Sequence, residues 1–382
     1  MPIIQAVGIV IEKVGAMRYS YFGRSIYMWC LLSGVLHGYT SYWYPVAQQQ
    51  DMLWVIHQTV GGQLQLHRYY PMTGLLQKER YSFNQEMLRG YSVERFQLLP
   101  GNVGYSFLDN GRLRIKYADR HSPLSVDFLY PVYEMNDIAW INACKGVMSA
   151  CYKEHFGLFY FMVDGRVAPI VWAQDKQYMH PQCANEWIYC VQKAQQQYAI
   201  VACKRSDPDI FHIPWHALSF DERSHMIMHA TDQWIVPDEM SVEKHVFYSS
   251  DRWIGYLQFD EANAYCYFLH ENVSENKEIV CVSWCCISLA IGHYQELFSF
   301  CIPKAFMSHH SGGLIESIWP LIPRRHKQTY YYSHYDEMLN ALGLYAYDLT
   351  TSTSQLLIAG QETHYFAPCF YNDLLYYATT SH

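Results

Sequence analysis

One pattern recurs along most of the chain and restricts the fold more than any single motif does. Each copy reads as an apolar strand, a polar turn, a second apolar strand, a polar turn and a short third strand. The stretch GLYAYDLTTSTSQLLIAG (343–360) is the second half of one copy. The four clearest copies are Met52–Gln77, Val103–Phe128, Val147–Trp172 and Glu186–His212. Because an isolated hairpin is only marginally stable in water, we expect these units to pack as an array.

A short segment marked by aromatic residues or proline precedes each copy, and its spacing gives the period. These segments begin at Tyr39, Tyr91, Tyr133, Tyr178 and His229, which lie 42 to 52 residues apart. A four-stranded propeller blade takes about 40–50 residues, so the spacing predicts an all-β propeller.

The two ends of the chain predict how the array closes. The interval from His229 to Thr363 holds two blades, with insertions at 271–278 and 308–313. The last residues read as two strands, and a further strand is expected at Ser25–Leu32. Ends that pair in one blade leave no open sheet edge, so we expect one domain, 1–382, with seven blades and a range of six to eight. The alternatives are a solenoid or a β-sandwich, and a sandwich of this length needs two domains and a linker that the sequence lacks.

Composition favours a β protein and argues against a nucleic-acid partner. Aromatic residues make up 16% of the chain and include 34 Tyr, a residue that suits pleated, half-buried surfaces. Charged residues are also 16%, below the average of about 25%, which argues against disorder. The net charge is −8, and the scattered Lys and Arg residues form no basic stripe for a phosphate backbone.

The 12 cysteines and the apolar runs bear on the compartment. The cysteine spacing matches no zinc motif, and most cysteines lie in apolar strand-like runs, as Cys190 and Cys203 do. We expect buried structural thiols in a reducing compartment, with disulfides as the alternative. The first residues lack the basic region of a signal peptide, and the longest apolar run, 279–292, is too short to span a bilayer. The sequence thus predicts a cytoplasmic protein without a membrane span.

The hairpin at 343–360 carries a motif that resembles known propeller repeats. Tyr345, Asp348 and Thr350 form the pattern YxxDxTxx, and Leu356–Ile358 and Pro368 follow. This arrangement resembles the TolB-like and WD40-like repeats. The chain departs from them where the Ser-Pro-Asp-Gly turn is expected, and it has no Gly-His or Trp-Asp signature. The resemblance implies the architecture and no activity.

Histidines open several of the expected first strands of blades. They are His180, His229, His309, His310 and His364. First strands surround the central channel of a propeller, so these imidazoles would meet at one mouth and could bind Mn, Fe, Ni or Zn. Gln182, Asp232 and Glu316 lie a few positions further on. The alternative is that they are structural or surface histidines, because the chain holds 19 of them.

This histidine pattern resembles the metal-bearing propeller lyases of pectin breakdown. That resemblance implies a divalent-metal site made by His180, Gln182, His229, His310 and His364, acting on an acidic saccharide. Other catalytic motifs are absent from the sequence: GxSxG, GxGxxG and GxxxxGK[ST] do not occur, and the pair His225 and His229 lacks the glutamate of HExxH.

Runs of consecutive aromatic residues predict a binding surface. Neighbouring residues of a strand face opposite sides of the sheet, so in each run one ring is directed away from the core of its own sheet. Exposed Tyr and Trp anchor protein interfaces and sugar-binding surfaces, whereas the alternative is packing between blades. The region Glu296–Pro320 is the expected binding edge. The candidate binding residues are Tyr42, Trp43, His309, Trp319 and Tyr331.

Two functional hypotheses follow. The first is a non-enzymatic propeller scaffold that recognises a protein or a carbohydrate on one face. The second is a metal-dependent lyase or hydrolase that acts on an acidic saccharide through the histidine cluster.

Overall fold

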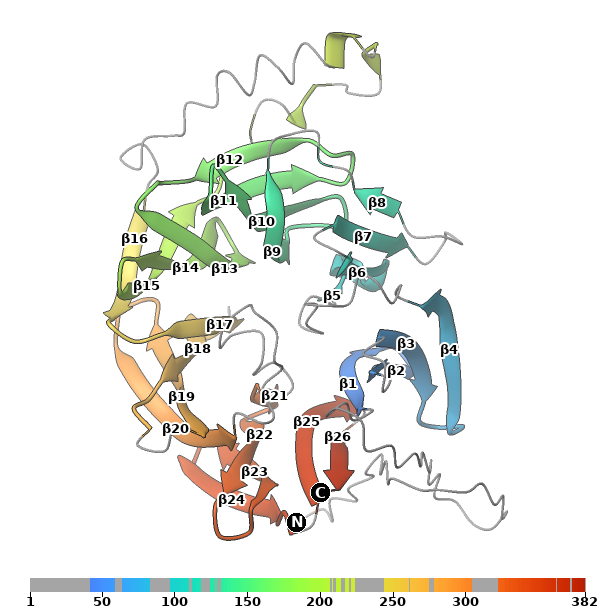
Figure 1. Cartoon of the computed structure of the whole chain (residues 1–382), viewed down its shortest axis with the longest axis vertical. Helices are drawn as coiled ribbons and strands as arrows, with labels where there is room; N and C mark the ends of the chain where they lie inside the picture. Colours follow the sequence, from blue (N-terminus) through green and yellow to red (C-terminus); the bar gives the residue numbers. More distant parts are fainter. Residues whose placement is uncertain are drawn as a thin grey trace. The chain divides into compact units, whose positions relative to one another are not determined.

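A computed structural model gives the fold of this chain (Figure 1). The structure describes residues 42–58, 64–82, 97–109, 112–117, 124–126, 128, 132–206, 208, 211–213, 217–219, 221–223, 244–260, 262–274, 278–303, 322–361, 363–371 and 373–381.

The fold is all-β and of the propeller class, as the repeat predicted. Among the described residues, six sheets have four antiparallel strands each, in chain order, and a seventh has two. The complete blades therefore number six, within the expected range of six to eight. Helix in this part of the chain is limited to short stretches at 100–102, 211, 217 and 221–223, and none is long and apolar enough to cross a membrane.

The chain divides into two compact units, whose boundary falls within strands β19 and β20. Unit 2 takes its described residues from Arg95–Asn272 and Val282–Leu297. Its strands include β5 (Gln97–Leu98), β6 (Gly104–Asp109), β7 (Arg112–Tyr117), β8 (Leu124–Val126), β9 (Tyr133–Trp140), β10 (Lys145–Tyr152), β11 (His155–Met162), β12 (Val167–Val171), β13 (Lys176–Ala184), β14 (Trp187–Ala194), β15 (Gln197–Lys204), β16 (Lys244–Ser250), β17 (Ile254–Asp260) and β18 (Tyr265–Glu271). Strands β19 (Ile279–Ser288) and β20 (Tyr294–Pro303) complete the sheet that begins with β17.

Unit 1 takes its described residues from Met1–Glu94, Val273–Cys281 and Phe298–His382. Its remaining strands are β1 (Tyr42–Gln49), β2 (Met52–Gln58), β3 (Leu64–Tyr70), β4 (Leu75–Ser82), β21 (Arg324–His326), β22 (Thr329–Asp336), β23 (Ala341–Asp348), β24 (Thr353–Ile358), β25 (Thr363–Tyr371) and β26 (Leu374–Ser381). The two strands expected after residue 362 are β25 and β26. The strand expected at Ser25–Leu32, which was to pair with them, lies outside the described residues.

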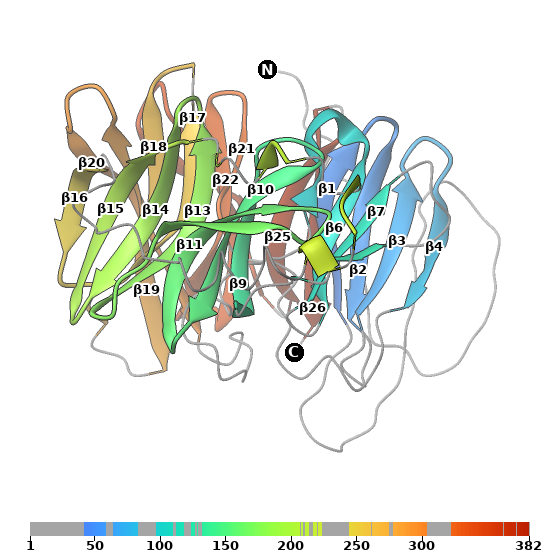
Figure 2. The same cartoon turned by 90° about the horizontal axis from the view of Figure 1, so that it is seen from above.

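The core of unit 2 explains why its strands read as continuous apolar runs. On β14, Ile188 and Cys190 pack toward β10–β12, while Tyr189 and Val191 pack toward β17–β19. Successive strand residues face opposite sides, so a sheet that is covered on both faces needs apolar residues at every position. Figure 2 shows strands β13, β14 and β15 side by side in this covered sheet.

Aspartate side chains form the hairpin turns that the repeat motif predicted. Asp348 ends β23, and its Oδ1 accepts the N–H groups of Thr350 and Thr351 at 2.7 and 3.1 Å. These bonds favour the charged carboxylate and lower its pKa. Asp336 accepts two backbone N–H groups in the same way after β22. The motif YxxDxTxx therefore encodes an Asx turn between two strands.

One blade boundary differs from the sequence prediction. A blade was expected to start at His229, but strand β16 begins at Lys244 and completes the preceding sheet, so 205–243 is the connection between β15 and β16. The next first strand is β17, whose sequence IGYLQFD lacks the proline that marked β13. The proline and aromatic residues that follow His229 therefore do not mark the start of a blade.

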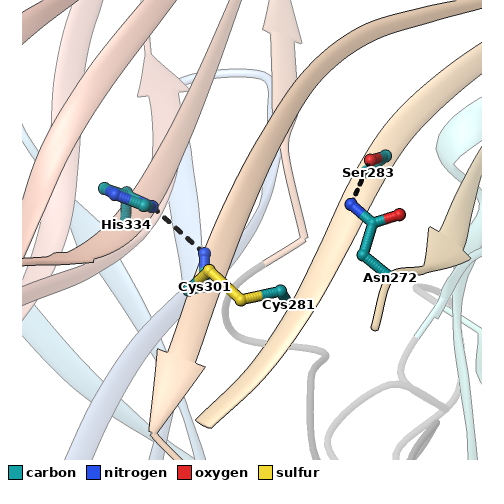
Figure 3. Close-up of a disulfide and its surroundings, with 5 residues drawn as sticks. All are labelled: Asn272, Cys281, Ser283, Cys301 and His334. Carbon is teal, nitrogen blue, oxygen red and sulfur yellow. Dashed lines mark hydrogen bonds between the residues drawn. A yellow bond between two sulfur atoms is a disulfide. The ribbon is translucent and has the colours of Figure 1, made fainter. Parts of the chain in front are cut away.

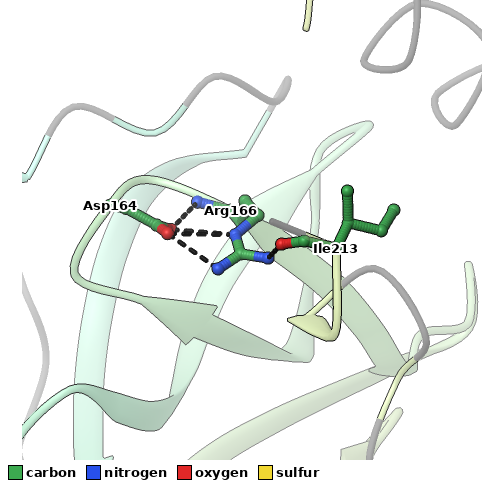
Figure 4. Close-up of polar contacts among 3 residues, drawn as sticks. All are labelled: Asp164, Arg166 and Ile213. Atoms are coloured by element: carbon green, nitrogen blue, oxygen red, sulfur yellow. Dashed lines mark hydrogen bonds and ion pairs between the residues drawn. The ribbon is translucent and has the colours of Figure 1, made fainter. Parts of the chain in front are cut away.

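The start of this long connection is fixed to the sheet β9–β12. Arg166, in the turn between β11 and β12, is 5% exposed. Its guanidinium binds both carboxylate oxygens of Asp164 at 2.8 to 3.1 Å and donates to the carbonyl of Ile213 at 3.1 Å (Figure 4). The ring of Phe211 contacts Tyr160 at 6.3 Å between centroids. A buried guanidinium needs such a complete set of acceptors.

The cysteines are unpaired as expected, with one exception. Cys281 on β19 and Cys301 on β20 form a disulfide, and their Cα atoms are 4.1 Å apart (Figure 3). The expectation of free thiols is wrong for this pair, because a cross-strand register brings together two residues that are far apart in sequence. The other nine cysteines that the structure describes form no disulfide, and Cys285 and Cys286 are buried in β19 as expected.

Candidate functional site

The same backbone irregularity recurs in the first strand of several sheets. The pairing register shifts between Met179 and Gln182 in β13, between Gly255 and Gln258 in β17, and between Phe366 and Cys369 in β25. Each shift is a β-bulge that leaves two residues out of the pairing register. One residue of each bulge has positive φ: His180 at 53°, Tyr256 at 53° and Ala367 at 50°.

These bulges hold residues in an unfavourable conformation. A non-glycine residue with left-handed φ loses roughly 1–2 kcal/mol. The bulge tolerates Pro181 since it removes the ladder hydrogen bond that proline cannot make. Bulges of this kind redirect side chains and are frequent next to functional sites.

In unit 2 the bulge places His180 against a carboxylate on a neighbouring sheet. Nδ1 of His180 lies 2.7 Å from Oδ2 of Asp137, which is on β9. The other oxygen of Asp137 accepts the N–H of Ile138 at 3.0 Å, so the carboxylate is fixed. An ionised carboxylate only accepts hydrogen bonds. In the neutral imidazole of His180 the proton is therefore on Nδ1, and Nε2 carries a lone pair.

The second ring nitrogen of His180 has no hydrogen-bond partner among the residues that the structure describes. The residue is 8% exposed, and Nε2 is buried without a hydrogen bond. A buried polar atom left unpaired loses about 1–3 kcal/mol. Such an atom needs a partner, which a water molecule, an ion or a ligand can supply.

Aromatic side chains from β17 and the turn before it complete the surroundings. The ring of Tyr256 stacks on His180 with 5.8 Å between centroids, and Trp253 meets Tyr256 edge-on at 6.3 Å. Trp253 is 6% exposed, and its Nε1 also has no hydrogen bond. A Cβ on Gly255 would lie 2.3 Å from Cζ2 of Trp253, so only glycine allows this packing. We call Asp137, His180, Trp253 and Tyr256 the bulge site.

The bulge site can perform three kinds of chemistry. An imidazole whose Nδ1–H is held by a carboxylate is an oriented general base at Nε2. The same pair is the usual arrangement behind a histidine that binds a metal. It also accepts a hydrogen bond from a bound ligand, while the aromatic rings offer an apolar surface.

Two further residues of the expected metal site lie in the described part of the chain. Gln182 is half-buried on β13, two residues after His180. His364 is buried on β25 in unit 1, where its Nδ1 accepts the N–H of Leu342 at 3.0 Å. His229 and His310 lie outside the described residues. Among the residues that the structure does describe, no three His, Cys, Asp or Glu side chains are grouped to hold a metal.

The expected binding residues are only partly described. Tyr331 on β22 is half-buried, and its ring packs on Phe370 of β25 at 4.6 Å between centroids. Burial raises the pKa of Tyr331. Tyr42 and Trp43 form part of β1, but their side chains are outside the described set, as are His309 and Trp319 altogether.

Sequence reasoning missed three members of the bulge site: Asp137, Trp253 and Tyr256. Asp137 lies inside the segment YEMNDIAW, which was used only to mark a blade. An acidic residue within an otherwise strand-like segment was the available signal. The bulge at Tyr256 gives no such signal, because its sequence, IGYLQFD, reads as an ordinary strand.

Comparison with known proteins finds similar solved structures. No protein-family model and no curated protein matches the chain. The fold is similar to that of an oligogalacturonate lyase from Vibrio parahaemolyticus, with 8% identity, a TM-score of 0.48 and 90% of each chain covered. It is also similar to an oligogalacturonate lyase in complex with manganese, with 9% identity, a TM-score of 0.46, and 87% of this chain and 86% of that chain covered. It is similar as well to TolB from Acinetobacter baumannii, with 7% identity, a TM-score of 0.46, and 86% of this chain and 67% of that chain covered.

Proposed function

We propose that this chain is a propeller scaffold that binds a carbohydrate at the bulge site. The observation that carries the proposal is the Nε2 atom of His180. It is buried, Asp137 fixes its orientation, and it has no hydrogen-bond partner within the described part of the chain. A ligand hydroxyl that donates to this nitrogen satisfies it and holds the ligand against Tyr256.

The combination of groups favours a sugar over an apolar ligand. Sugars present hydroxyl donors beside an apolar face of C–H groups, and aromatic rings pack on such faces. The bulge site pairs an imidazole acceptor with the ring of Tyr256, which is half-buried. A protein partner on an outer face is the alternative binding mode, supported by exposed apolar residues such as Met338, at 93% exposed.

One observation favours a second candidate, an enzyme that acts on an acidic saccharide. The pair of Asp137 and His180 has the geometry of a general base whose orientation is held by a carboxylate. In this candidate, Nε2 removes a proton from the sugar ring or holds a divalent metal, which would neutralise the substrate carboxylate. Gln182 is the nearest further candidate ligand in sequence.

Calorimetric titration with oligosaccharides tests the proposed function. Galacturonate oligomers serve as the acidic probe and glucose oligomers as the neutral probe. We expect the chain to bind one of them and H180A to bind at least about tenfold more weakly, which corresponds to one lost hydrogen bond. The control H293A removes an exposed imidazole from the turn between β19 and β20 and should bind normally. Equal affinity in H180A, or no binding of either probe, contradicts the proposal.

Two further measurements on the same samples distinguish the scaffold hypothesis from the enzyme hypothesis. An eliminating lyase produces a double bond conjugated to a carboxylate, so ultraviolet absorbance rises during incubation with galacturonate oligomers. Elemental analysis of untagged protein purified without chelator gives the metal content. Less than about a tenth of an equivalent of transition metal removes the metal-dependent candidate.

A further inference from the structure

A second reactive pair joins the end of β16 to β18, and it goes beyond the proposed carbohydrate binding. Ser250 ends β16, and its Oγ lies 2.8 Å from Nε2 of His270 on β18. Both residues belong to unit 2 and are half-buried. A hydroxyl at this distance from an imidazole nitrogen is the contact that activates nucleophilic serines.

Two further contacts of Ser250 bear on the direction of its proton. Oγ accepts the N–H of Arg252 at 3.0 Å, and it also forms a side-chain hydrogen bond with Tyr248. With the Arg252 N–H and the Tyr248 hydroxyl as donors to Oγ, the hydroxyl hydrogen of Ser250 is donated to His270. This requires that Nε2 of His270 carries a lone pair.

The surroundings of His270 lower its pKa and so favour the neutral imidazole. Burial lowers its pKa, and the charge of Arg252 lowers it further, against the opposing charges of Glu296 and Asp251. The ring of Tyr248 also meets His270 edge-on, with 5.9 Å between centroids, and restricts its rotation. A neutral, positioned imidazole is the form that takes a proton from a serine.

We propose that Ser250 is a nucleophilic serine and His270 its general base, forming a site for carboxylic esters. Oγ bonds to the carbonyl carbon while its proton passes to Nε2 of His270. The ester C–O bond then breaks as His270 returns that proton to the leaving alcohol. Water hydrolyses the acyl-serine by the same transfer, which regenerates the hydroxyl. The exposed Arg252 is placed to stabilise the negative charge that develops on the carbonyl oxygen.

A fluorophosphonate probe tests this proposal on the full chain. Attack by Oγ forms a Ser–phosphorus bond and releases fluoride, while the serine proton passes to His270. Mass spectrometry of peptides identifies the labelled residue. We expect the label on Ser250 and none in S250A. H270Q should slow labelling by about a hundredfold or more, the usual contribution of a general base.

Matched variants separate reactivity from a structural role. S249A removes the neighbouring exposed hydroxyl and H245A an exposed imidazole of the same strand, and both should label like the wild type. The melting temperature of H270Q, measured by circular dichroism, establishes that the variant is folded, and H270N replaces it if it is not. Absence of label on Ser250, or an unchanged rate in the folded His270 variant, overturns the proposal and leaves Ser250 as a turn-capping residue. The titrations with H180A are independent of this result.

Discussion

Strands β13 and β25 share a backbone conformation and differ in chemistry. Each contains a bulge with one positive-φ residue followed by proline, and each contributes a buried histidine. On β13 that histidine is in the bulge itself, and Asp137 accepts the proton of its Nδ1. On β25 the bulge residue is Ala367, and His364 lies three residues earlier, where it accepts a backbone N–H at Nδ1.

The difference shows that the two histidines are opposite tautomers. His180 keeps its proton on Nδ1 and presents a lone pair at Nε2, whereas neutral His364 carries its proton on Nε2. Only His180 is prepared to accept a proton, a hydroxyl or a metal without breaking its present hydrogen bond. The bulge belongs to the repeated backbone, and the residue placed in it differs from strand to strand.

Deletion of residues 363–382 is expected to have the largest effect. It removes Tyr371 and Tyr376 from their contacts with Leu53 and Val55, and it removes Leu375 from Leu344. Each large apolar side chain contributes about 1.5–3 kcal/mol when buried, so the total is comparable to the stability of a whole domain. We expect the cooperative thermal transition seen by circular dichroism to be lost. An unchanged melting temperature would show that β25 and β26 are not part of the core.

Replacement of the two histidines by alanine should give unequal losses of stability. H364A leaves the N–H of Leu342 buried and unpaired beside a cavity, and should lower the free energy of unfolding by about 2–4 kcal/mol. H180A removes one bond to Asp137, whose side chain is 26% exposed, and should lower it by about 1 kcal/mol. Urea titration measures both. If H180A is the more damaging change, His180 is a structural residue and the functional contrast fails.

A third buried histidine, His67, should make the stability of the chain depend on pH. His67 on β3 is 7% exposed, and burial, with smaller effects of His57 and Lys78, lowers its pKa from 6.5 to about 4. Because the unfolded chain binds this proton more tightly, stability should fall as pH decreases from about 6.5 to about 4. Urea midpoints across this range in the wild type and in H67F measure the effect. If the urea midpoint depends on pH equally in H67F and in the wild type, another group causes the loss of stability in acid.

The prolines of the two bulges should give the smallest and the most similar effects. P181A and P368A each increase the conformational entropy of the unfolded chain. Each should therefore lower the free energy of unfolding by about 0.4–1 kcal/mol. Both positions follow a residue with positive φ, so the two losses should agree within about 0.5 kcal/mol. A much larger loss in P181A would indicate that the bulges are not equivalent.

The fold was predictable from sequence where local chemistry repeats. The hairpin at 343–360 formed as expected because Asp348 supplies the turn and apolar residues flank it. Features set by contacts between distant strands were not predictable. The bond between Asp137 and His180 joins two sheets, and the disulfide of Cys281 depends on a cross-strand register. The bulge at Tyr256 leaves no trace in composition, so the aromatic part of the site was missed.

The tautomer of His180 tests the central claim most directly. Long-range proton–nitrogen correlation spectra of protein labelled with 15N-histidine distinguish the two neutral forms, and the signal lost in H180Q identifies the residue. We predict a proton on Nδ1 and a lone pair on Nε2 in the wild type, with this preference weakened in D137N. A wild-type His180 with its proton on Nε2 would contradict the account, because the bulge site would then have no acceptor to offer.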